Sequence, residues 1–178
     1  ANLYALVGPE VEGGVILSGH TDVVPVDGQE WDTDPFTVTE KDGRLYGRGT
    51  CDMKGFDALA LAHVPDMLKA GMKRPVQIAL SYDEEVGCIG APFMIEEMAQ
   101  TLPKASACIV GEPSMMKVVT GHKGSVGFIT RVHGFEMHSS LMHESVSAVM
   151  TAARLITWLH EQTQNNMANA DPANPFHP

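Results

Sequence analysis

The protein has 178 residues, 44% of them hydrophobic, so the chain can bury the core of one ordinary domain, or of one domain and part of another. It carries 12 Lys and Arg residues against 22 Asp and Glu residues, which gives a formal net charge of −10. This balance argues against nucleic acid as a partner, because the neutralisation of phosphates requires a basic face. It suits the binding of cations.

The cysteines and the apolar runs indicate the compartment. Cys51, Cys88 and Cys108 are odd in number and form no CxxC pair, which predicts free thiols in a reducing compartment. No apolar run approaches the ~20 residues of a membrane span, and we find no signal peptide. We therefore expect a cytoplasmic protein without a membrane partner. We also expect both ends of the sequence to be cut from a longer chain.

Apolar runs and helical periodicity predict the elements of the first part of the chain. They are a strand from residue 1, a buried strand at 15–20, a hairpin around Asp42-Gly43, a helix at 53–70 kinked at Pro65, a strand at 75–82, a helix at 91–100 and a strand at 107–110. This order predicts an α/β fold with a largely parallel central sheet flanked by helices.

The character of the sequence changes after Glu112-Pro113. Residues 124–132 alternate in polarity and predict a strand, residues 146–160 predict an amphipathic helix, and residues 162–178 predict a loop or linker. We place a domain boundary between residues 122 and 123, and expect residues 123–178 to begin a smaller α+β domain.

Acidic residues and a histidine follow the predicted strands. His20 and Asp22 lie two residues apart in extended chain and therefore point to the same face, as a metal ligand and its orienting carboxylate would. A polar turn at a strand end is the alternative. Asp52 precedes a helix, where it is either a ligand or an N-cap.

Two further acidic motifs close later strands. The acids Asp83-Glu84-Glu85 follow one strand and would repel one another unless a cation, or the N-terminus of the helix that follows, offsets their charge. Glu112 follows the next strand. Since the carboxyl ends of parallel strands gather at one edge of a sheet, these side chains should converge there. One imidazole and several carboxylates form the donor set of a catalytic zinc site.

These motifs, taken in order, resemble those of the dinuclear zinc aminoacylase and carboxypeptidase family. The resemblance rests on His20-Thr21-Asp22, on the stretch from Gly47 to Gly55, on Asp83-Glu84-Glu85 and on Gly111-Glu112-Pro113. It covers almost the whole chain. It implies a fold of the zinc-dependent exopeptidase type, with residues 1–122 as the incomplete catalytic domain and residues 123–178 as the start of a lid and dimerisation domain.

The resemblance also implies a role for each matching residue. His20 and Glu112 would bind one zinc ion, Glu85 would bind a second, and Asp52 would bridge the two from a cis peptide bond with Met53. Asp22 would orient His20, and Glu84 would be the general base. His138 would stabilise the oxyanion in the active site of a neighbouring subunit.

The activity that this family implies is hydrolysis of the amide bond of an N-acyl amino acid, with N-acetylornithine, an intermediate of arginine biosynthesis, as the leading substrate. A succinylated diaminopimelate or a peptide is the alternative. The cofactor would be two Zn²⁺ ions, with Co²⁺ able to substitute, and the full-length protein would be a homodimer joined through the second domain.

One histidine ligand that the family carries near its C-terminus has no match here. We therefore expect the 178 residues alone to be inactive. A metal-binding or interaction module without catalysis is the alternative from another class of function.

Overall fold

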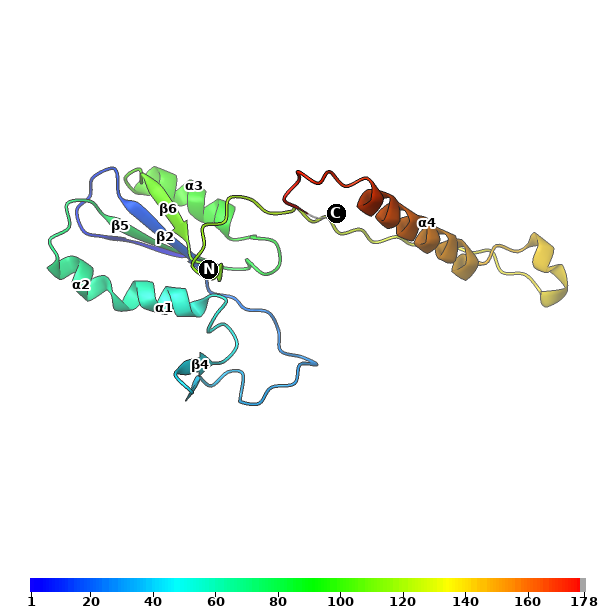
Figure 1. Ribbon diagram of the computed structural model, residues 1–178, viewed down its shortest axis with the longest axis horizontal. Helices are drawn as coiled ribbons and strands as arrows, with labels where there is room; N and C mark the ends of the chain where they lie inside the picture. The colour runs from blue at the N-terminus through cyan, green and yellow to red at the C-terminus, as the bar shows by residue number, and fades with distance from the viewer. Residues whose placement is uncertain (177–178) are drawn as a thin grey trace. The chain divides into compact units, whose positions relative to one another are not determined.

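The computed structural model describes residues 1–176, and Figure 1 labels its elements. His177, to which the sequence analysis assigns no role, lies outside this range. The chain divides into two compact units, residues 1–117 and 118–178. The division falls after Lys117, whereas the boundary expected from the sequence is between residues 122 and 123.

A four-stranded sheet organises the first unit. It consists of β1 (Leu3–Val7), β2 (Val15–His20), β5 (Val76–Ser81) and β6 (Ala107–Val110), in the order β1-β5-β2-β6. β2 is parallel to both of its neighbours, β5 and β6, and only β1 is antiparallel. The predicted α/β fold with a largely parallel sheet is confirmed.

Helices cover both faces of this sheet (Figure 1). They are α1 (Lys54–Ala62), α2 (Val64–Lys69) and α3 (Ala91–Thr101). The kink predicted at Pro65 is confirmed as a break between α1 and α2 at His63. Proline lacks an N–H and its ring obstructs the preceding turn, so a new helix starts where Pro65 is tolerated. The predicted hairpin also forms, from β3 (Thr39–Lys41) and β4 (Arg44–Tyr46).

The core lies on either side of β5. On one face Ile78 and Leu80 pack with Val7 and with residues of α2. On the other face Ala79 packs against Met94 and Met98 of α3. Successive side chains of a strand point to opposite faces, so a strand covered on both sides is largely apolar, and in β5 only Gln77 and Ser81 are polar. This double cover fixes β5 and the chain that follows it.

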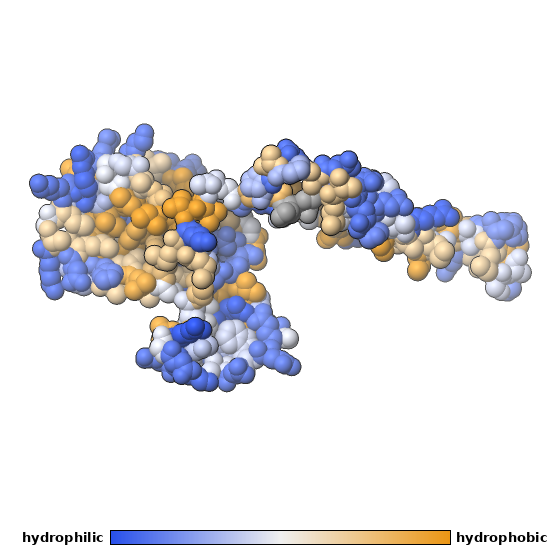
Figure 2. Space-filling view, in the orientation of Figure 1, coloured by the Kyte–Doolittle hydropathy of each residue, from blue (hydrophilic) through white to orange (hydrophobic). Residues whose placement is uncertain are grey.

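β6 is an edge strand with apolar residues in contact with solvent. Ile109 and Val110 are 52% and 60% exposed. Hydrophobic colouring gathers over this part of the sheet on the face that Figure 2 shows. An uncovered apolar edge strand of this kind offers a pairing surface.

The second unit departs from the expectations for its sequence. The prediction of a strand at 124–132 is wrong, because none of those residues forms a strand. The isolated β-bridge described in this unit joins Phe135 to Val146. A strand requires a paired neighbour, and the alternating apolar side chains of this segment, among them Val126 and Phe128, stay exposed.

The helices of the second unit are η1 (Ser139–Glu144) and α4 (Ala148–Ala168). α4 begins at an N-cap, Ser147, whose side chain accepts a hydrogen bond from the backbone N–H of Met150. The predicted end near residue 160 is wrong because no Gly or Pro interrupts the helix before Pro172, so residues 162–168 continue it. None of the helices between residues 1 and 176 is long and apolar enough to cross a membrane.

α1 approaches β2 closely at Gly19. A Cβ atom at this position would lie 2.0 Å from Oδ1 of Asp57, a side chain of α1 that is only 6% exposed. Among residues 1–176 that oxygen has no hydrogen-bond partner, and burial raises the pKa of the Asp57 carboxyl. Glycine at residue 19 therefore sets the distance between the helix and the strand.

We predict that Gly19→Ala lowers the free energy of unfolding by about 1–3 kcal/mol, the usual range for overpacking. Urea denaturation measures the loss. The double variant Gly19→Ala/Asp57→Ala should lose less than the sum of the two single variants, because removal of the carboxyl makes room for the new methyl group. Strict additivity would show that the overlap is not the cause.

Candidate metal centre

The ends of three parallel strands bring the predicted site residues to one edge of the sheet. His20 is the last residue of β2, Glu84 and Glu85 follow β5, and Glu112 follows β6. The sheet ladder continues past these ends, because Thr21 donates its N–H to the carbonyl of Ser81, at 2.9 Å. The polar residues at the ends of these strands therefore lie at the same edge of the sheet, as expected for an open α/β sheet.

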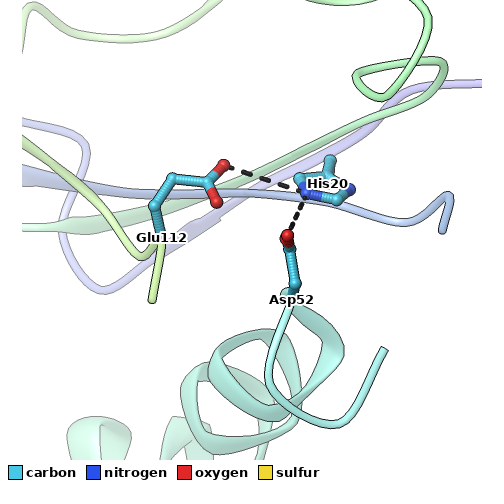
Figure 3. Close-up of side chains that lie close together, drawn as sticks. All are labelled: His20, Asp52 and Glu112. Atoms are coloured by element: carbon cyan, nitrogen blue, oxygen red, sulfur yellow. Dashed lines mark hydrogen bonds and ion pairs between the residues drawn. The ribbon is translucent and has the colours of Figure 1, made fainter. Parts of the chain in front are cut away.

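His20, Asp52 and Glu112 converge at this edge (Figure 3). One ligand atom from each residue lies within 4.8 Å of the others. Nε2 of His20 is 3.1 Å from Oδ1 of Asp52 and 3.8 Å from Oε1 of Glu112. The imidazole is buried, whereas the two carboxylate side chains are 49% and 43% exposed. The cluster is thus anchored in the core and open to solvent.

The hydrogen bonding of His20 leaves one nitrogen for a ligand. Nδ1 lies 3.0 Å from the backbone carbonyl oxygen of Asp22, which can only accept. This contact favours the tautomer with its proton on Nδ1 and the lone pair on Nε2. Nε2 faces the carboxylates, so the ring is oriented as a metal-ligating histidine requires.

Asp52 does not cap the helix that follows it. The N-cap of α1 is Met53, and no side chain provides a capping hydrogen bond there. The Asp52 carboxylate instead points to His20. The peptide bond between Asp52 and Met53 is cis, which the family resemblance implied. The position of Asp52 therefore supports the ligand interpretation over the capping interpretation.

Asp22 connects two of the strand ends. Its Oδ1 and Oδ2 accept the backbone N–H groups of Glu84 and Glu85, both at 3.0 Å. Oδ1 of Asp22 lies 3.5 Å from Nδ1 of His20, whereas the backbone carbonyl oxygen of Asp22 lies 3.0 Å from the same nitrogen. Burial opposes the ionised form of Asp22, but the hydrogen bonds from backbone N–H groups and the charge of His20 together lower the pKa of this carboxyl. The carboxylate thus holds the acidic loop after β5 against the end of β2.

Glu84 and Glu85, two of the three acidic residues that follow β5, differ in their contacts. Oε2 of Glu84 lies 3.9 Å from Nε2 of His20. Oε1 of Glu84 accepts a hydrogen bond from the thiol of Cys88, at 3.2 Å. Among the described residues, Glu85 does not belong to the cluster of His20, Asp52 and Glu112. Its backbone N–H donates a hydrogen bond to Asp22. Nothing in the sequence pattern signalled the contact with Cys88.

The charges at this edge favour a cation. Burial of the His20 ring opposes its charged form, but the hydrogen bond with Asp52 and the other negative groups around it raise the pKa of His20. Burial and the negative charge of Asp52 raise the pKa of Glu112. The neighbouring carboxylates contribute to both shifts, because carboxylates crowded around one imidazole favour its charged form and repel one another.

The donor set is that of a zinc site. Zinc in proteins takes imidazole nitrogen and carboxylate oxygen ligands at about 2.0–2.2 Å, so its ligand atoms lie roughly 3–4 Å apart. The separations of 3.1 Å and 3.8 Å measured from Nε2 of His20 agree with this spacing. The residues present therefore fit a divalent metal ion.

His138 belongs to the second unit and is described by itself. It is the N-cap of η1, and its Nδ1 accepts the backbone N–H of Ser140 at 3.3 Å. The hydroxyl of Ser140 lies 2.9 Å from the same nitrogen. Since Nδ1 is an acceptor, the ring proton lies on Nε2, which is a donor.

The comparisons with known proteins decide the family. The sequence pattern described as Peptidase family M20/M25/M40 matches residues 16–175. The chain belongs to this family. Its members include metal-dependent hydrolases, so the metal dependence expected from the donor set is supported by the relationship.

Curated relatives named acetylornithine deacetylase match most of the chain. The chain is 41% identical to the protein of Erwinia tasmaniensis in a match that covers 78% of the chain and 38% of the relative. It is 39% identical to that of Yersinia pseudotuberculosis in a match that covers 92% of the chain and 44% of the relative. The chain thus spans about two fifths of the length of these relatives.

Solved structures of the same family share the fold. An M20 family metallo-carboxypeptidase from Sulfolobus solfataricus is similar to 62% of the chain, with a TM-score of 0.55 and 28% identity, and the match covers 25% of that protein. Human carnosine dipeptidase 1 is similar to 61% of the chain, with a TM-score of 0.53 and 28% identity, and the match covers 24% of it. The expectation of a family fold is confirmed.

We predict that Glu112→Gln weakens the binding of Zn²⁺ by more than about tenfold, because it removes a charged oxygen from the cluster. Equilibrium dialysis with metal analysis of the complete protein measures the affinity. The matched control is Glu96→Gln, an exposed acid of α3 that lies outside the cluster, and it should leave the affinity unchanged. Equal affinities for the two variants would contradict the assignment.

Proposed function

We propose that the complete protein hydrolyses the amide bond of an N-acyl amino acid, with N-acetylornithine as its substrate. The convergence of His20, Asp52 and Glu112 at the carboxyl edge of the sheet carries this proposal. The relatives named acetylornithine deacetylase, at about 40% identity, support the choice of substrate.

We assign two zinc ions to the centre. His20 and Glu112 would hold one ion, Glu85 would hold the other, and Asp52 would lie between them. When bound, the ions would polarise the substrate carbonyl and lower the pKa of a water molecule toward neutrality. The net charge of the chain, −10, and the mutual repulsion of the carboxylates support the binding of two divalent cations.

Glu84 would move the proton. Its side chain is 34% exposed, so water can reach it, and its Oε2 faces the cluster rather than belonging to it. In this position Glu84 would take a proton from the attacking water and pass it to the nitrogen of the leaving amine. Asp22 would keep Glu84 in reach, because its carboxylate holds the backbone N–H of that residue.

His138 would stabilise the oxyanion that develops on the carbonyl oxygen. Its Nε2 is a donor, as the acceptor role of Nδ1 toward Ser140 requires. We propose that residues from 123 onward begin a lid and dimerisation domain, and that His138 serves the active site of the partner subunit in a homodimer. This arrangement would make the cytoplasmic enzyme depend on assembly.

We predict that Glu84→Gln in the complete protein lowers kcat by about 10²- to 10⁴-fold, the usual contribution of a general base. Its zinc content, measured by atomic absorption, should stay at the wild-type value. Glu85→Gln is the matched variant and should lose metal as well as activity. Loss of zinc from the Glu84 variant would mean that Glu84 is a ligand rather than the base.

The substrate assignment has a direct test. We expect kcat/KM of the zinc-loaded complete protein to be higher for N-acetylornithine than for N-succinyl-diaminopimelate or a dipeptide. A preference for either of the other two would assign a desuccinylase or a carboxypeptidase of the same family. Hydrolysis of none of them by a protein that binds zinc would favour the non-catalytic metal-binding alternative.

A further inference from the structure

The loop after β5 folds back on itself at Glu84. The carbonyl oxygen of Glu84 accepts the N–H groups of both Gly87 and Cys88, each at 2.9 Å. The chain then rejoins the end of β5, because Gly90 donates its N–H to the carbonyl of Tyr82, at 3.1 Å. This turn brings the side chain of Cys88 over the side chain of Glu84.

The thiol of Cys88 contacts one oxygen of the Glu84 carboxylate, and the other oxygen faces His20. Sγ of Cys88 donates to Oε1, at 3.2 Å, while Oε2 lies 3.9 Å from Nε2 of His20. A carboxylate on a long side chain rotates about its last bond unless a contact holds it. The thiol therefore fixes the rotation of the carboxylate, so that its second oxygen faces His20.

Cysteine is an unusual choice for this backbone position. The φ angle of Cys88 is +57°, in the left-handed region that favours glycine. Its side chain is exposed, so the thiol fills no core. A turn needed only for its shape would be better served by glycine, and the side chain must therefore be accounted for by what it touches.

The thiol keeps its proton beside the cluster. The hydrogen bond to Glu84, burial and the negative charges of the surrounding carboxylates raise the pKa of Cys88. A protonated thiol is a donor, whereas a thiolate would repel the carboxylate. The observation that carries the hydrogen bond is the separation of Sγ from Oε1, 3.2 Å.

We propose that Cys88 is a positioning residue for Glu84, whose S–H group holds Oε1 so that Oε2 faces the reacting water. The inference rests on the proposed function, in which Glu84 is the general base. It assigns to Cys88 no contact with the substrate and no covalent step.

Kinetics of three substitutions in the complete, zinc-loaded protein test the proposal. Cys88→Ala removes the donor, Cys88→Gly removes it while relieving the left-handed backbone, and Cys88→Ser keeps a donor at nearly the same place. We expect kcat of the Ala and Gly variants to fall about 3- to 10-fold, the range for a lost hydrogen bond. KM and zinc content should not change, and the Ser variant should recover most of the loss.

Cys108→Ala is the matched control, because this exposed thiol lies on β6 away from Glu84. Its kcat should equal that of the wild type. Wild-type kcat in both Cys88→Ala and Cys88→Gly would overturn the proposal. A fall in kcat accompanied by loss of zinc, or the same loss in Cys88→Ser as in Cys88→Ala, would overturn it too.

A spectroscopic readout tests the contact without activity or metal. The infrared S–H stretching band that disappears in Cys88→Ser identifies this thiol in the metal-free protein. We expect Glu84→Ala to move that band to higher frequency, because a hydrogen bond to a carboxylate weakens the S–H bond. A band that does not move would contradict the contact.

Different results would remove the proposed function and the role of Cys88. An inactive wild-type protein, or a Glu84→Gln variant with full kcat, would remove the proposed function and the role of Cys88 with it. An active wild type with an inactive Glu84→Gln variant and fully active Cys88 variants would remove the role of Cys88 alone.

Discussion

The crowding of carboxylates around the buried imidazole of His20 is the constraint on which the rest of the structure depends. Oxygens of Asp52, Glu84 and Glu112 all lie within 4 Å of Nε2. Such an arrangement is unfavourable without positive charge. Burial lowers the pKa of His20 but the carboxylates raise it, and burial together with the neighbouring carboxylates raises the pKa of Glu112. A protein keeps groups in this arrangement when the local cost serves binding or catalysis.

The fold supports the cluster through backbone contacts rather than through the ligands alone. Asp22 holds two backbone N–H groups of the acidic loop, and glycines allow close approach where side chains would separate the elements. At Gly111, next to Glu112, an added Cβ would lie 2.1 Å from the ring of Phe56. The helix α1 thus lies directly against the strand ends, and this proximity places Asp52 beside His20.

The sequence predicted the sheet and the convergence of the site because both follow from local pattern. A buried strand is a run of apolar residues, and the polar residue that ends it marks the edge where ligands bind. Which of the acids Asp83-Glu84-Glu85 faces His20 depends instead on how the loop folds back, which also brings Cys88 to Glu84. The strand expected at 124–132 shows the same limit, because alternation indicates a strand only where a neighbour pairs with it.

The most direct test of the central claim is a crystal structure of the complete protein grown with zinc, with anomalous differences recorded at the zinc edge. The account predicts an ion about 2.0–2.2 Å from Nε2 of His20 and from carboxylate oxygens of Asp52 and Glu112. Zinc bound elsewhere, with Nε2 of His20 still hydrogen-bonded to Asp52, would contradict it.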